Sequence, residues 1–156
     1  MYKLEITDDM SDLEKFVRQE ADNYVNSTIF LSSISTHHKN IDSVVEKGKD
    51  VVPYVVKLYK ENGEYSNQNM YTHFFLIVMQ RLYGNPFEGY VGMDFAIRYW
   101  LKRYEYDLLD DYDENTDEEK EKKFFLDLFQ CKDEEELIKC MINTEAYVRP
   151  DTKDSE

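Results

Sequence analysis

The segment from Met70 to Tyr83 limits the possible folds of this chain more than any other part of it. It consists mostly of apolar and aromatic residues and has no charged residue before Arg81. A helix that is apolar on every side is usually buried on every side. Gly84-Asn85-Pro86 follows at once and predicts the end of this helix. The sequence therefore predicts a central apolar helix with other helices packed around it.

The residues before this segment have the spacing of amphipathic helices. Ser11 and Glu14 have the form of a capping box, and apolar residues follow at intervals of three and four. A short helix over Ile41 to Val45 is predicted to end at Gly48, which adopts the left-handed conformation at low cost. Asp50 is placed to cap the helix after it.

Three more helices are predicted after the central one, because apolar residues recur at helical spacing in each. They cover Asp94 to about Leu109, Thr116 to Phe129 after a second capping box, and Asp133 to Ile142. The predicted fold class is all-α, a single compact domain of about five to seven helices over residues 1–148. Within it, residues 1–10 are expected to form an extended arm, and residues 149–156 to form a flexible tail.

The composition excludes several classes of partner. The chain has 33 acidic and 19 basic residues, a net charge of −14, and this balance opposes binding to phosphate backbones or anionic membranes. We therefore expect no direct nucleic-acid binding. We also expect no membrane association, because the chain has no stretch of about 18 uninterrupted apolar residues that could span a membrane. Cys131 and Cys140 fall on one predicted helix-turn-helix and are expected to be buried thiols, which favours a cytoplasmic location.

A dense run of acidic residues is the strongest functional signal. From Glu105 to Glu121, ten of seventeen residues are Asp or Glu and only Lys120 is basic. Such a patch either is solvated or binds a cationic partner. The residues expected to bind a partner are Glu105, Asp107, Asp110, Asp111, Asp113, Glu114, Asp117 and Glu118, with Tyr104, Tyr106 and Tyr112 among them as aromatic anchors.

This run predicts mimicry of a nucleic acid. A compact chain of this length is about 40 Å across, and B-DNA of that length carries roughly 24 phosphates, of which about half face one side. The net charge of the chain, −14, is of the same order. The competing interpretation is that these acids only keep a tyrosine-rich protein in solution, because charge runs are usually solvated surface.

Catalytic and metal-binding patterns are weak by comparison. His37, His38 and His73 have neither of the usual helical zinc spacings, although His38 and His73 could join acidic residues around a metal. A calcium loop starting at Asp111 fails, because Thr116 and Lys122 stand where Gly and Glu are required. No nucleophile elbow or glycine-rich phosphate loop is present. We expect no cofactor, no metal and no enzymatic activity.

Several short motifs between residues 27 and 103 form one pattern: Ser32-Ser33, His38, Val44-Val45, Gly48-Lys49, Val52-Pro53, Phe74-Phe75, Gly84-Asn85-Pro86 and Trp100-Leu101. With these motifs, residues 27–103 resemble a widespread family of small, uncharacterised helical proteins of bacteria and phages. The resemblance implies a helical fold without assigning an activity. The Gly-Lys-x-Val-Val-Pro part also resembles one unit of a helical HEAT-type repeat, which implies a binding surface.

The sequence thus predicts a non-enzymatic, acidic protein-binding module. Its sharper form is an inhibitor encoded by a phage or mobile element, which occupies the basic groove of a nuclease or other nucleic-acid-binding protein. Two alternatives stay open: a metal-assisted hydrolase that uses His38, His73 and acidic residues, and a structural homo-oligomer.

Overall fold

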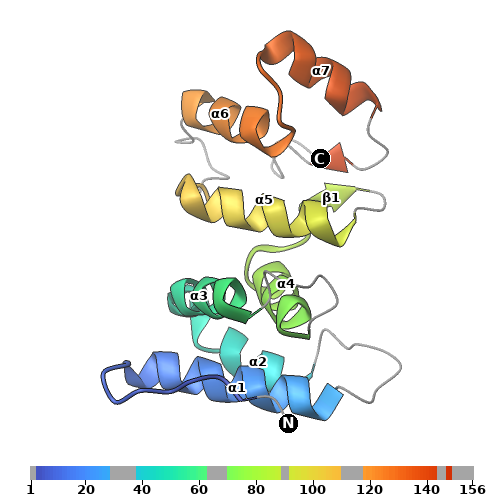
Figure 1. Cartoon of the computed structure of the whole chain (residues 1–156). Coiled ribbons are helices and arrows are strands. Elements are labelled where there is room, and N and C mark those ends of the chain that lie inside the picture. The colour runs from blue at the N-terminus through green and yellow to red at the C-terminus, as the bar shows by residue number, and fades with distance from the viewer. Residues whose placement is uncertain are drawn as a thin grey trace. The chain divides into compact units, whose positions relative to one another are not determined.

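The computed structural model describes residues 3–28, 38–62, 70–88, 92–109, 118–143 and 147–148. These residues form seven α-helices, so the prediction of an all-α fold with five to seven helices is confirmed (Figure 1). A two-residue antiparallel ladder, with Phe87 opposite Val148, was not predicted. The elements are α1 (Asp12–Thr28), α2 (Lys39–Val45), the 3-10 helix η1 (Gly48–Val51), α3 (Val52–Asn62), α4 (Met70–Tyr83), β1 (Phe87–Glu88), α5 (Met93–Glu105), α6 (Glu118–Leu128), α7 (Glu134–Asn143) and β2 (Tyr147–Val148).

The contacts within the chain divide it into two compact units. Unit 1 comprises Met1–Gly84 and unit 2 comprises Asn85–Glu156. The predicted boundaries of one domain over residues 1–148 and a tail over 149–156 stay a prediction, because residues 149–156 lie outside the described ranges.

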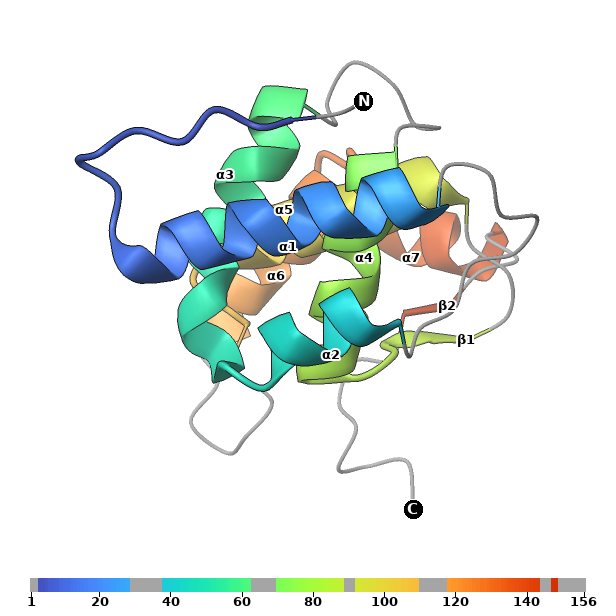
Figure 2. The ribbon, with the colours of Figure 1, turned by 90° about the horizontal axis from the view of Figure 1, so that it is seen from below.

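Helix α4 is the centre of unit 1, and it has the bounds that its apolar composition predicted. It contacts α1, α2 and α3 (Figure 2). The side chains of Phe74 and Phe75 are completely buried. Phe75 stacks on Tyr59 of α3 with the ring centroids 4.8 Å apart, and Phe74 packs against Tyr24 of α1 at 5.7 Å. Large aromatic side chains packed in this way supply much of the burial that holds a small helical core together.

The ends of the helices in unit 1 follow the sequence signals, with two differences. Ser11 Oγ accepts a hydrogen bond from the Glu14 N–H at 3.1 Å, so Ser11 caps α1 as predicted. The Glu14 carboxylate instead pairs with Lys57 and with an arginine of α1. Gly48 has the predicted left-handed backbone, with φ of 80°. Asp50 lies inside η1 and is therefore not the cap expected for the next helix.

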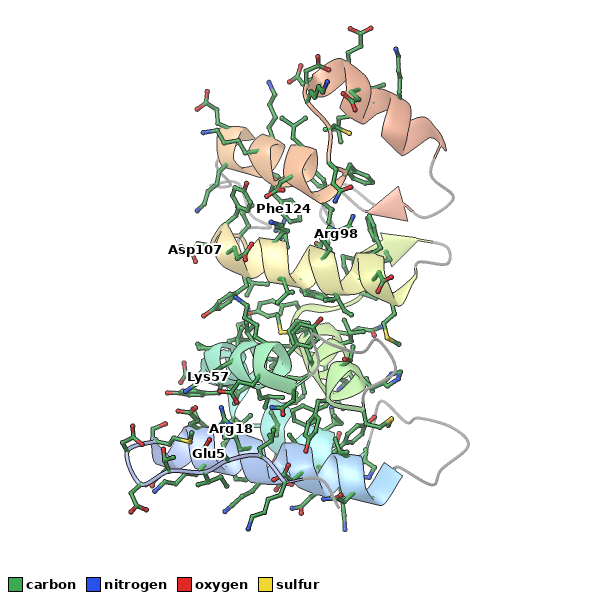
Figure 3. The ribbon with its side chains drawn as sticks, viewed as in Figure 1. Glu5, Arg18, Lys57, Arg98, Asp107 and Phe124 are labelled. Carbon is green, nitrogen blue, oxygen red and sulfur yellow. The ribbon has the colours of Figure 1, made fainter. Side chains whose placement is uncertain are left out.

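Unit 2 is built from α5, α6, α7 and the two short strands. Phe124 of α6 is completely buried and points toward α5 (Figure 3). Its ring lies at 76° to the ring of Tyr99, with the two centroids 5.6 Å apart. Arg98 of α5 donates a hydrogen bond to the Leu128 carbonyl at 3.2 Å, at the end of α6. Helix α5 ends at Glu105, four residues before the predicted end at Leu109.

Candidate functional site

The structure describes the beginning of the predicted acidic surface. Tyr104, Glu105, Tyr106 and Asp107 lie in the last turn of α5 and just beyond it. Glu118 is described only as the first residue of α6. The remaining predicted residues lie outside the described ranges, namely Asp110, Asp111, Tyr112, Asp113, Glu114 and Asp117.

The chain leaves α5 through a left-handed residue, Asp107. Its φ is 56°, and its N–H donates to the Tyr104 carbonyl at 3.1 Å. The Leu108 N–H donates to the Arg103 carbonyl at 2.9 Å. These two bonds form a Schellman motif, which usually has glycine at the left-handed position. Asp tolerates that conformation better than most residues, so the first exposed acid after Glu105 also shapes the turn.

A buried arginine holds the residues after this turn. Arg103 is 1% exposed, and its guanidinium lies 5.0 Å from the Phe124 ring centroid and 5.8 Å from that of Tyr99. Its Nη2 donates to the Leu108 carbonyl at 2.6 Å. The guanidinium is thus desolvated against aromatic faces, where cation–π attraction is strongest. The first residues after α5 therefore have a fixed position in unit 2.

Two of the predicted residues at this end already have partners within unit 2. Lys102 Nζ lies 3.1 Å from Asp127 Oδ2 and 3.5 Å from Glu105 Oε2. The Tyr106 hydroxyl donates to the same Asp127 oxygen at 3.1 Å. Hydrogen bonding to Asp127 raises the pKa of Lys102, and burial followed by the Asp127 contact raises the pKa of Tyr106. The side chain of Asp107 is exposed, as Figure 3 shows.

Negative charge is distributed very unevenly between the two units. Unit 2 contains 21 acidic and 10 basic residues and has a net charge of −11. Unit 1 contains 12 acidic and 9 basic residues and has a net charge of −3. The run from Glu105 to Glu121 accounts for most of this difference. A cationic partner is therefore attracted mainly to unit 2.

A second group of acids begins helix α7. Asp133 caps the helix, because its Oδ1 accepts the Glu136 N–H at 2.9 Å. Glu134 pairs with Lys122 of α6 at 2.7 Å, and Glu135 lies 3.8 Å from Lys139. Both pairs are exposed, and exposed pairs contribute little to stability. These acids lie on the surface of unit 2 and extend its negative charge.

The described histidines have structural surroundings. His38 caps α2, because its Nδ1 accepts the Asn40 N–H at 3.1 Å, and its Nε2 lies 3.0 Å from Ser27 Oγ. A metal ion could bind either nitrogen only at the expense of one of these bonds. Burial lowers the pKa of His73. In the part of the chain that the structure describes, no three His, Cys, Asp or Glu side chains are grouped so as to hold a metal ion.

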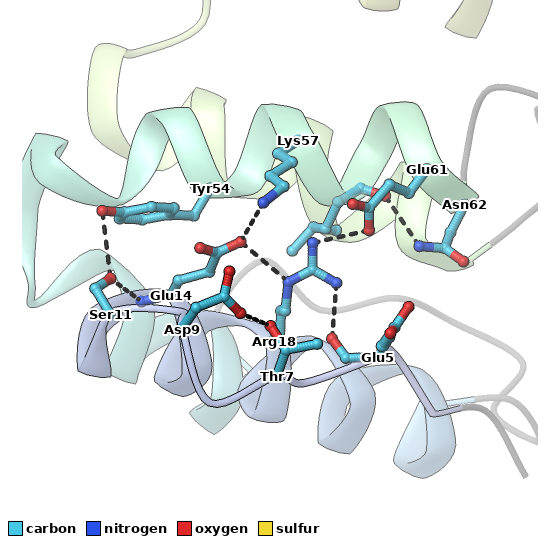
Figure 4. Close-up of polar contacts among 11 residues, drawn as sticks. Glu5, Thr7, Asp9, Ser11, Glu14, Arg18, Tyr54, Lys57, Glu61 and Asn62 are labelled. Atoms are coloured by element: carbon cyan, nitrogen blue, oxygen red, sulfur yellow. Dashed lines mark hydrogen bonds and ion pairs between the residues drawn. The ribbon is translucent and has the colours of Figure 1, made fainter.

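Sequence patterns did not predict the polar cluster around Arg18 in unit 1, which Figure 4 shows. Arg18 is 1% exposed, and its Nη2 donates to Glu61 Oε2 of α3 at 2.8 Å. Its Nε lies 3.4 Å from Glu14 Oε2, close enough for an ion pair but without the geometry of a hydrogen bond. Lys57 Nζ donates to the same Glu14 oxygen at 2.9 Å. One feature of the sequence could have indicated this cluster: Arg18 adjoins the apolar stripe of α1 and follows Glu14 by four residues.

Comparison of the chain with protein-family models, curated proteins and solved structures gives no match. The resemblance over residues 27–103 therefore stays a prediction. Within the described ranges, no helix is both long enough and apolar enough to cross a bilayer.

Proposed function

We propose that the chain is a non-enzymatic, acidic protein-binding module that acts in the cytoplasm. In this proposal unit 2 binds a basic surface, and the preferred partner is a nuclease or another nucleic-acid-binding protein whose groove normally holds phosphates. The observation that carries the proposal is the charge of −11 on unit 2, compared with −3 on unit 1.

The fixed end of α5 supports this proposal. Because the Schellman motif and the Arg103 hydrogen bond hold Asp107 and Leu108 in place, the acidic run begins at a defined point of unit 2. Acids attached to an ordered scaffold lose less conformational freedom on binding than acids on an unstructured tail. Tyr104 is partly exposed beside them and provides an aromatic contact. An inhibitor encoded by a phage or mobile element would work in this way.

A pair of charge-matched variants of the full chain tests the proposal. The first variant, D110N/D111N/D113N/E114Q, removes four acids from the run in unit 2. The control variant, E5Q/D8N/E46Q/D50N, removes four exposed acids from unit 1 and gives the same net charge. Both variants and the wild type are used to recover partners from a bacterial lysate, and each recovered protein is then purified for binding measurements at several salt concentrations.

If the proposal is right, the wild type should recover nucleic-acid-binding proteins from the lysate, and duplex DNA should displace these proteins from it. Each should bind the first variant at least about tenfold more weakly, and with a shallower dependence on salt, because fewer charge contacts remain. The control variant should bind within about twofold of the wild type, since the proposal assigns no contact to these four acids and a charge outside the contact is partly screened by salt. Equal binding by both variants would exclude the acidic run as the interaction surface, and recovery of no DNA-displaceable partner would exclude mimicry.

A further inference from the structure

We propose that unit 1 contains a docking groove for an extended peptide of a partner protein, and that the chain's own N-terminal arm, residues 3–7, occupies this groove as an internal ligand. The arm is not helical, and it runs back along α1 (Figure 1). This site is separate from the acidic surface of unit 2 and does not depend on the function proposed for it.

The main chain of the arm is bound by two side chains of α1. Both carboxylate oxygens of Asp22 accept the Leu4 N–H, each at 3.0 Å. Arg18 Nη1 donates to the Glu5 carbonyl at 3.0 Å, as Figure 4 shows. Asp22 follows Arg18 by four residues, so the two side chains lie on one face of the helix. Hydrogen bonds to main-chain groups recognise any extended peptide, whatever its side chains.

A single side chain of the arm supplies specificity. Leu4 is 3% exposed, whereas its neighbours Lys3 and Glu5 are exposed and Ile6 is 36% exposed. Burial of this apolar side chain favours the bound position of the arm. The groove therefore selects a peptide with one aliphatic side chain at the position of Leu4 and tolerates variation on either side. A partner segment needs only this residue and an extended backbone.

The groups that hold the arm are themselves held by other helices. Asp22 Oδ1 accepts a hydrogen bond from the Tyr71 hydroxyl of α4 at 2.8 Å. Arg18 is held by Glu61 of α3 and by Glu14, which in turn binds Lys57. These contacts do not involve the arm, so its departure removes none of them directly. A binding site whose polar groups stay in position has a smaller ordering cost for the next ligand.

The connection between the arm and α1 allows the arm to leave. Asp8 and Asp9 are exposed, and the turn is closed by one main-chain bond from the Met10 N–H to the Thr7 carbonyl at 3.2 Å. The Thr7 hydroxyl donates to Asp9, and this bond lowers the pKa of Asp9. A short connection of this kind gives the arm an effective concentration of order millimolar at the groove. The internal ligand thus weakens the binding of any partner peptide in solution.

Peptide binding to the full chain tests this proposal. The variant Leu4→Asp removes the aliphatic side chain from the arm and so favours a vacant groove. The probe is a fluorescent, acetylated peptide with the sequence of residues 3–10, and the control probe is the same peptide with the Leu4→Asp change. The native peptide should bind the L4D protein at least about tenfold more tightly than it binds the wild type. The control peptide should bind neither protein, and the double variant L4D/D22A should lose binding of the native peptide.

Two results would overturn the proposal. The first is an L4D protein that keeps the circular dichroism of the wild type and yet does not bind the native peptide, because the groove would then close without the arm. The second is a concentration-dependent dimer of the wild type that L4D abolishes, because the occupant would then be the arm of a second copy.

Hydrogen exchange of the wild type tests the same proposal if L4D fails to fold. The amide of Leu4 should exchange through a local opening, and much faster than the amides of α4. Exchange of Leu4 only together with α4 would show that the arm is a permanent part of the core and would reject the docking site.

Discussion

Replacing Arg18 with methionine should destabilise the protein far more than the same change at a surface arginine. Arg18 is 1% exposed and its loss leaves Glu14, whose side chain is only 9% exposed, with Lys57 alone. Removing one partner of a buried ion pair costs about 3–5 kcal/mol. Because Glu14 keeps Lys57, and because Glu61 is 43% exposed and regains water, we expect the lower end of that range, about 3 kcal/mol.

Arg81 provides a matched control in the same unit. It pairs with Asp42 at 2.8 Å, but the two side chains are 26% and 46% exposed. An ion pair at such a surface contributes at most about 1 kcal/mol, so Arg81→Met should have a small effect. Urea titrations followed by circular dichroism give the free energy of unfolding of both variants and the wild type. Losses of equal size, or a loss below about 1 kcal/mol for Arg18→Met, would refute the argument from burial.

The double variant E14Q/R18M separates two contributions to the stability lost in Arg18→Met: the charge that remains on Glu14, and the other interactions of Arg18. If the buried charge of Glu14, left with Lys57 as its remaining partner, causes much of the destabilisation, then removing that charge should restore part of the stability that Arg18→Met lost. A double variant that is less stable by the sum of the losses in E14Q and R18M would show that Arg18 does not act through the charge of Glu14.

Three further predictions concern backbone conformation and pH. Gln130 has φ of 58° in the turn after α6, so Gln130→Gly should raise the free energy of unfolding by about 0.5–1 kcal/mol in urea titrations. A lower free energy of unfolding in this variant would show that the left-handed backbone at Gln130 is not strained. Gly84 has φ of 89° with nothing within 4 Å of an added Cβ, so Gly84→Ala should lower the free energy of unfolding by about 1 kcal/mol for conformational reasons alone. An unchanged free energy of unfolding would show that the turn relaxes. Burial raises the pKa of Tyr24 to about 12, whereas an exposed tyrosine has a pKa near 10. Between about pH 10 and 12 the unfolded chain therefore releases a proton that the folded chain keeps. Stability should therefore fall as the pH rises from about 10 to 12, by an amount on the order of 2 kcal/mol, and Tyr24→Phe should lack this part of the decline; identical pH profiles would exclude Tyr24 as its source.

The central helix could be predicted from sequence because its signals are local. Met70 to Tyr83 is apolar on most sides, and Gly84 follows with the backbone conformation that ends a helix. Ser11 likewise caps α1 through its own side chain. Signals of this kind depend on neighbouring residues, so they require no knowledge of the tertiary structure.

The end of α5 was predicted wrongly because the pattern of apolar residues continues past it. Leu108 and Leu109 are both buried, as a longer helix would require. They are buried beyond a Schellman turn at Asp107, where the carbonyl of Leu108 accepts a hydrogen bond from Arg103. Periodicity of apolar residues reports burial, but it does not distinguish a continued helix from a turn that returns the chain to the same core.

The buried arginines were missed for a related reason. Charged residues are almost never fully buried unless they are paired, so a pattern analysis assigns them to the surface. Two of the partners of Arg18, Glu61 and the Glu5 carbonyl, are distant from it in sequence. Of the acidic surface itself, the described part shows Glu105 and Tyr106 in contact with Lys102 and Asp127, which the sequence did not indicate.

The two buried arginines each attach a stretch of non-helical chain to a helix. Arg18 of α1 donates to the Glu5 carbonyl, and Arg103 of α5 donates to the Leu108 carbonyl. Because both acceptors are main-chain carbonyls, these hydrogen bonds do not depend on the side chain of the residue that accepts them. Substitution of the exposed Glu5 side chain should therefore leave its segment attached to α1, whereas loss of Arg18 removes the donor.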